Sequence, residues 1–185
     1  MKNKLQKGDY GYLNKAKLRE LIISFVLILM VLIIFYTGYI KYKNTKNIFT
    51  VFAAVSVIPT ARFLVSYIVM APHKVIDRKS YEYLNQCKDI TLLYDLLVSS
   101  KEKIMHLEVV AVKDNSIYVY TKNHKKTKAE IEKFIRLMFE KQCRLSAVKS
   151  FDNLESYRNA VNSLSGNESG RYDDRIKELL LIYSM

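Results

Sequence analysis

Two long apolar stretches come first along the chain, ahead of a region in which apolar and charged positions alternate. Residues 21–40 contain no charged residue, and twenty helical residues at about 1.5 Å each match the roughly 30 Å hydrocarbon core of a bilayer. A second apolar stretch, 48–71, follows after only seven residues. The first stretch is too long for a signal peptide, and no small-residue cleavage site follows it. The pattern therefore predicts a two-helix transmembrane hairpin.

The second apolar stretch carries Pro59 and Arg62 near its centre. Arginine at that depth costs about 2.5 to 3.5 kcal/mol, and each of the many Ile, Leu, Val and Phe residues around it offsets about 0.3 to 0.6 kcal/mol, so insertion remains favourable. Neither stretch contains Asp or Glu. We expect Arg62 to be satisfied by lipid phosphate, by carbonyls freed near Pro59, or by another subunit, and an ion or substrate path is the functional alternative.

Positive charge flanks the predicted hairpin. Residues 1–20 contribute four of the twelve excess positive charges, residues 41–47 contribute three, and the long region 72–185 contributes only four. Six Lys and Arg precede the first stretch, and Lys74, Arg78 and Lys79 follow the second, against three in the loop. By the positive-inside rule, both termini are predicted to be cytoplasmic, in a multi-pass protein of the plasma membrane.

Residues 75–165 predict a small cytoplasmic α/β (α+β) domain in the order α-β-β-β-α-β-α. A linker and an amphipathic helix follow in 166–185, with the helix over 173–183. The most secure helix begins at a capping box of Thr127 and Glu130, and a later one is predicted to begin at Asp152 with Glu155. The first helix is expected over 80–88 and the strands over 90–98, 104–112, 117–121 and 143–149.

The distribution of glycine excludes the common phosphate-binding loops. Glycine occurs only at positions 8, 11, 38, 166 and 170, whereas such loops need glycine for positive φ and close backbone approach. No GxSxG, HExxH or CxxC motif is present, and Cys87 and Cys143 are expected to be reduced. No cofactor and no catalytic motif is therefore expected.

The element order resembles the core of restriction-endonuclease-like nucleases. Such sites carry an acid on one strand and an acid-x-Lys on the next, so that carboxylates hold Mg²⁺ while Lys assists the attacking water. Asp95 supplies a first acid and Glu108 a second, but Val110 stands where the lysine belongs, and the following strand offers Tyr118 and Tyr120. A divergent hydrolase using Asp95 and Glu108 is the enzymatic alternative.

Three possible metal ligands lie near the predicted β-hairpin. His106 and Glu108 are two residues apart on one polar strand face, and His124 follows in the next loop. Nothing in the sequence places His124 near the other two. A solvated strand face is the preferred interpretation, and no metal is expected.

A basic run precedes the predicted helix that begins at Thr127. Its cations, Lys122, Lys125, Lys126 and Lys128, lie near a helix N-terminus, where free N–H groups already favour an anion. A solvated loop is the preferred interpretation, a site for anionic lipid headgroups comes next, and a nucleic-acid site comes last. Nucleic acid is not expected, because the whole region carries little net charge.

The segments GDYGYLNKAK, FYTGYI and NIFTVFAAVSVIPTARFLV resemble a group of uncharacterised small bacterial membrane proteins with two N-terminal spans and a cytoplasmic α/β domain. The resemblance covers roughly residues 8–75. It implies the architecture and supplies no catalytic residue.

Together these features predict a non-enzymatic, membrane-anchored interaction or regulatory module. Its expected partners are the lipid bilayer, anionic lipid headgroups, and either an unidentified protein or a second copy of the chain.

Overall fold

The computed structural model describes residues 5–86, 90–99, 104–122, 127–140, 142–143, 145–164 and 170–185. The chain divides into two compact units. One contains residues 14–74, and the other contains the described parts of 1–13 and 75–185. The unit that includes the C-terminus is called the folded domain below.

The unit of residues 14–74 consists of two long helices, α1 (Tyr12–Tyr42) and α2 (Ile48–Met70). Both are long and apolar enough to cross a membrane, and they contain the predicted stretches 21–40 and 48–71 to within one residue. Asn47 caps α2, because its side chain accepts a hydrogen bond from the Thr50 N–H at 3.0 Å. A Cβ on Gly38 would lie 2.5 Å from that of Phe49, so glycine permits the close approach of the two helices near their loop.

The folded domain is built on a four-stranded mixed sheet in the order β1-β2-β3-β4. Its strands are β1 (Leu92–Ser99), β2 (Ile104–Lys113), β3 (Ser116–Tyr120) and β4 (Ala147–Phe151). The first three pair antiparallel, and β4 pairs parallel to β3. Asp114 and Asn115 join β2 to β3 with φ values of 51° and 52°, as a two-residue hairpin turn with two left-handed residues requires.

The first three strands lie within two residues of their predicted bounds, whereas the prediction of the fourth over 143–149 is wrong by several residues. The N–H groups of Gln142 and Cys143 still bond to the Phe139 carbonyl and complete the end of the preceding helix. Strand pairing therefore begins only at Ala147.

Four helices complete the domain: α3 (Arg78–Leu84), α4 (Lys128–Phe139), α5 (Leu154–Asn162) and α6 (Asp173–Tyr183). The predicted capping box of Thr127 and Glu130 begins α4, and α6 has its predicted bounds. Helix α3 begins earlier than predicted, because Asp77 caps it through Ser80. Asn153, one residue after the predicted Asp152, caps α5.

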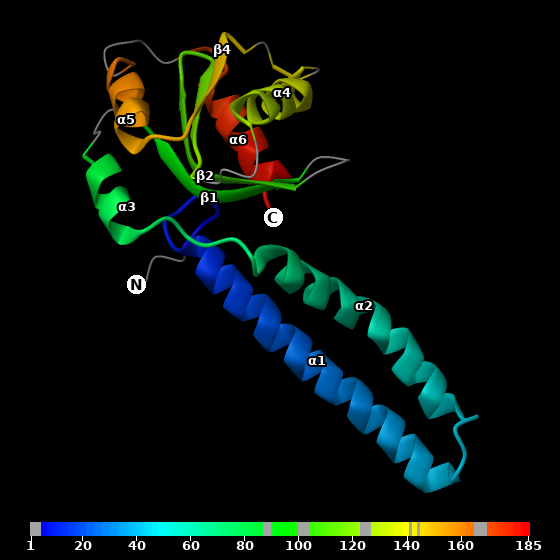
Figure 1. Cartoon of the computed structure of the whole chain (residues 1–185). Coiled ribbons are helices and arrows are strands. Elements are labelled where there is room, and N and C mark those ends of the chain that lie inside the picture. Colours follow the sequence, from blue (N-terminus) through cyan, green and yellow to red (C-terminus); the bar gives the residue numbers. More distant parts are fainter. Residues whose placement is uncertain are drawn as a thin grey trace. The chain divides into compact units, whose positions relative to one another are not determined.

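The helices cover the two faces of the sheet in pairs. Helices α4 and α6 lie on one face and helices α3 and α5 on the other (Figure 1). The first core, beneath α4 and α6, includes Val110, Ile117, Ile135, Phe139, Ile176 and Leu180. The second core, beneath α3 and α5, includes Leu84, Tyr94, Val109, Tyr120, Tyr157 and Val161.

Of the basic cytoplasmic N-terminus that the sequence predicts over 1–20, the part that precedes α1 belongs to the folded domain. The Tyr94 N–H of β1 donates to the Gly8 carbonyl at 2.8 Å, and the Lys7 ammonium donates to the Ser184 carbonyl at 2.7 Å. Tyr10 stacks on Tyr81 of α3 with ring centroids 4.2 Å apart. This segment therefore covers part of the outer edge of β1.

Candidate functional site

In β1 and β2, the regular alternation of side chains between the two faces of the sheet is interrupted at one position, and polar residues lie there. Leu93 and Leu96 of β1 both pack in the first core, although residues on one strand face are normally an even number apart. Leu107 and Val110 of β2 do the same. Both strands therefore exchange faces at the same level of the sheet.

Asp95 and Glu108 lie at the position where β1 and β2 exchange faces. Tyr94 pairs with Val109 and Leu96 pairs with Leu107, so Asp95 and Glu108 occupy the same level of β1 and β2 between these two pairs. Asp95 has a φ of 51°, a left-handed conformation that costs about 1 to 2 kcal/mol in a residue other than glycine. The structure thus brings together the two carboxylates that the sequence singled out.

The Asp95 carboxylate is enclosed by protein. Its side chain is 0% exposed, and Oδ1 accepts a hydrogen bond from the Ile76 N–H at 3.0 Å. His106 Nε2 lies 3.7 Å from the same oxygen. Oδ2 accepts no hydrogen bond from any residue in the described part of the chain. Asp95 therefore ties the segment that follows α2 to β1, and its carboxylate does not face solvent.

Glu108 is half-buried, and its Oε1 accepts a hydrogen bond from the Lys122 N–H at 3.0 Å. Burial raises the pKa of this carboxyl above its usual range; Asp95 raises it further, while the Lys122 N–H and His106 act in the opposite direction. The predicted solvated face of His106 and Glu108 is wrong, because the exchange of faces leaves the His106 side chain only 5% exposed.

Lys122, which the sequence assigned only to the basic run, is joined to Glu108 through its backbone N–H. It lies two residues after Tyr120, the last residue of β3. In the nuclease pattern an acid would stand at Tyr120. Burial, then the charges of Glu108 and Asp77, raise the pKa of the Tyr120 hydroxyl, which therefore stays protonated and supplies no anionic metal ligand at neutral pH. The spacing to Lys122 was the available signal.

Metal ligands are not gathered at this site. Among the described residues, no group of three or more His, Cys, Asp and Glu side chains is placed to hold a metal ion. His124, the third ligand of the metal alternative, lies outside the described residues.

Two of the four lysines of the basic run have acidic neighbours. Lys128 forms an ion pair with Asp152 at 2.8 Å, and the charge of Lys122 helps to lower the pKa of Asp77, which the hydrogen bonds from Ser80 lower most. Lys125 and Lys126 lie outside the described residues. Binding of anionic lipid by this run stays a prediction that depends mainly on Lys125 and Lys126.

Arg62 lies on an exposed side of α2, one turn after Pro59. Its carbonyl accepts a hydrogen bond from the Ser66 hydroxyl at 3.0 Å. Its guanidinium forms no hydrogen bond or ion pair with any residue that the structure describes. Its guanidinium therefore does not bond to the carbonyls near Pro59.

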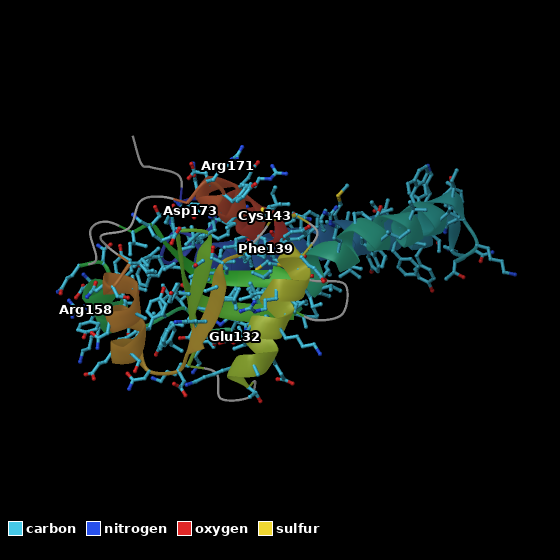
Figure 2. The ribbon with its side chains drawn as sticks, turned by 90° about the horizontal axis from the view of Figure 1, so that it is seen from above. Glu132, Phe139, Cys143, Arg158, Arg171 and Asp173 are labelled. Atoms are coloured by element: carbon cyan, nitrogen blue, oxygen red, sulfur yellow. The ribbon has the colours of Figure 1, made fainter. Side chains whose placement is uncertain are left out.

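A hollow of about 520 Å³ lies beside α4 and was not predicted. Its lining combines Leu137, which is 60% exposed, with Lys133 and Arg136. Figure 2 shows Cys143, another lining residue, close to Phe139 near the end of α4. In the sequence, the signal for this hollow was that Leu137 is apolar but lies off the predicted apolar face of α4. This hollow is a second candidate binding surface.

The chain was compared with protein-family models, curated proteins and solved structures, and none of them matches it.

Proposed function

We propose that the protein is an integral membrane protein whose helices α1 and α2 cross the plasma membrane as a hairpin, with both termini in the cytoplasm. The observation that carries this proposal is that both helices are long and apolar enough to cross a membrane, and a second observation supports a common side for their two ends. The segment before α1 and the segment after α2 bind neighbouring residues of one strand, through Tyr94 N–H to Gly8 and Ile76 N–H to Asp95. A hairpin that crosses the bilayer twice returns its ends to one side, as this arrangement requires.

Cysteine labelling in intact cells tests the topology. The variants Asn44→Cys, in the loop, and Glu178→Cys, on the exposed side of α6, are made in a chain whose Cys87 and Cys143 are replaced by serine. A membrane-impermeant maleimide should label position 44 in intact cells and position 178 only after permeabilisation. Labelling of 178 in intact cells would reverse the orientation, and release of the protein by alkaline carbonate would refute the hairpin.

We further propose that the folded domain is a non-enzymatic interaction or regulatory module held at the membrane. Asp95 supports this, because a fully enclosed carboxylate that binds the Ile76 N–H is placed to hold the chain and not to meet a substrate. The hollow beside α4 offers a concave surface to a partner. Loss of a co-purifying partner in Leu137→Glu, with unchanged melting temperature, is the expected result.

A divergent nuclease-like hydrolase remains the alternative, favoured by the opposed carboxylates of Asp95 and Glu108 and by the nearby Lys122. The test is cleavage of DNA by the purified full chain with Mg²⁺. Cleavage that Glu108→Gln abolishes would establish the alternative, and its absence at every divalent ion tried would remove it.

A further inference from the structure

We infer that the exposed side of α2 around Arg62 is a docking surface for a membrane-spanning helix of a different protein, one that carries an Asp or Glu within the bilayer. This inference rests on the proposed membrane insertion of α1 and α2.

Helix α2 has one closed and one open side. Ala53 and Thr60 are buried within the helix pair. Arg62 lies on the open side, together with Val55, Ile58 and Val65, which are 60%, 72% and 57% exposed. These positions are three, four or seven residues from Arg62, so they form one continuous ridge. The β-branched side chains of this ridge have few rotamers to lose on packing.

Arg62 stands well inside the apolar length of α2. It lies eight residues before Met70, which is about 12 Å along the axis. Side chains of a helix tilt toward its N-terminus, so the Arg62 side chain starts away from the nearer membrane surface. Snorkelling to that surface has to reverse this direction. An unpaired arginine at this depth is therefore unfavourable.

The positive charge of Arg62 also determines which group the partner helix must carry. Residues 21–71 contain no Asp or Glu, so neither this chain nor a second copy offers a carboxylate at that depth. Glu20, the nearest acid along α1, already pairs with Arg19 at 2.8 Å. A carboxylate on a different spanning helix would pair with the guanidinium bidentately and offset the cost of burying both groups.

A model helix tests this chemistry with the full-length chain. The protein, carrying a donor fluorophore at the loop position Asn44→Cys, is reconstituted in phosphatidylcholine vesicles with acceptor-labelled poly-leucine spans that carry one central Glu, Gln or Leu. We expect the Glu span to associate about three- to thirtyfold more tightly than the Leu span. Arg62→Leu should remove this difference, and Arg62→Lys should retain most of it. Val65→Ala shortens the ridge and keeps the charge, so it should weaken association of both spans and retain the preference for Glu over Leu.

Each outcome of this experiment decides one point. Equal association of the Glu and Leu spans, or a preference for Glu that survives Arg62→Leu, would overturn the inference, and the former would leave lipid phosphate as the partner of Arg62. Equal association of the Gln and Glu spans would also overturn it, because the carboxylate would then be unnecessary. Resistance of the reconstituted protein to alkaline carbonate is measured separately; its failure would refute the proposed membrane insertion itself.

Discussion

Asp95 and Glu108 lie at the same level of β1 and β2, between the pairs Tyr94–Val109 and Leu96–Leu107, where both strands exchange the faces of the sheet. The two carboxylates have different tasks. Asp95 is enclosed and holds the Ile76 N–H, whereas Glu108 is half-buried and holds the Lys122 N–H. The cluster therefore joins two connecting segments to the sheet: the one that follows α2 and the one that follows β3.

Replacing Asp95 should loosen the segment after α2. Asp95→Ala leaves the buried Ile76 N–H without an acceptor and places alanine at a φ of 51°, so a loss of about 2 to 4 kcal/mol of stability is expected. Asp95→Asn should lose less, because Asn keeps an acceptor oxygen and tolerates this conformation. Unfolding of the full chain in detergent, followed by circular dichroism, measures both. Equal losses would mean that the charge of Asp95 matters more than its hydrogen bond.

Glu108 should make stability depend on pH. Its folded-state pKa is raised, so the folded domain loses stability as pH rises through the unfolded value near 4.5 toward the folded value. Glu108→Gln removes this loss and keeps an acceptor for the Lys122 N–H. The variant should melt higher than the parent at pH 7.5 and at nearly the same temperature at pH 4. Glu178→Gln, at an exposed position, is the control and should show no such pH-dependent difference.

Asp173 should be the most sensitive residue of α6. Its carboxylate accepts hydrogen bonds from the N–H groups of Asp114, Asn115 and Gly170 at 2.7 to 3.0 Å, and it is 4% exposed (Figure 2). Asp173→Ala should therefore cost about 3 kcal/mol of unfolding free energy. Asp174→Ala, at an exposed neighbour, should change it by less than about 0.5 kcal/mol. Equal effects of the two variants would contradict the role of this carboxylate.

Two glycines of the N-terminal segment test its docking on β1. Gly8 and Gly11 have φ values of 89° and 80°, so alanine is strained at both. A Cβ on Gly8 would lie 2.9 Å from Leu93 Cδ2, whereas one on Gly11 meets no atom within 4 Å. Gly8→Ala should destabilise the domain by about 1 kcal/mol more than Gly11→Ala. Hydrogen exchange at the Tyr94 N–H should be faster only in the Gly8 variant.

The basic run before α4 should respond to anionic lipid. In vesicles that contain phosphatidylglycerol, hydrogen exchange in the full chain over residues 122–128 should be slower than in phosphatidylcholine alone, and high salt should remove the difference. Lys125→Glu combined with Lys126→Glu should abolish the slowing. Lys133→Glu, on the α4 surface, is the control. Equal exchange in both lipids would leave this run as a solvated loop.

Helices and strands that depend on interactions between residues close in sequence could be predicted from the sequence. The capping box of α4 and the amphipathic pattern of α6 place hydrogen-bond acceptors and apolar residues within one or two turns, so both helices were predicted correctly. The meander of β1, β2 and β3 follows from its alternation and its short turn. The start of β4 was wrong, because residues 142–143 bond back to α4 instead of pairing with β3.

The candidate site depends on contacts between residues far apart in sequence. The side-chain chemistry of Asp95 and Glu108 is enough to identify them as candidates. Their proximity, however, depends on the register of β1 against β2, which the sequence does not give. The exchange of faces that encloses His106 coincides with the left-handed φ of Asp95, and an aspartate within an apolar run does not by itself predict that conformation. The docking of residues 5–13 on β1 likewise lacks a local pattern.

The two hydrogen bonds at Tyr94 and Asp95 also bear on the order of assembly. Gly8 is made early in synthesis, yet its partner Tyr94 follows only after the whole of α1 and α2. The folded domain is thus an interrupted fold, with the apolar hairpin inserted between its first segment and the rest. Because contacts so distant in sequence form late, the domain cannot close until both helices have left the ribosome. The fold of this domain is therefore completed only after both helices have been synthesised.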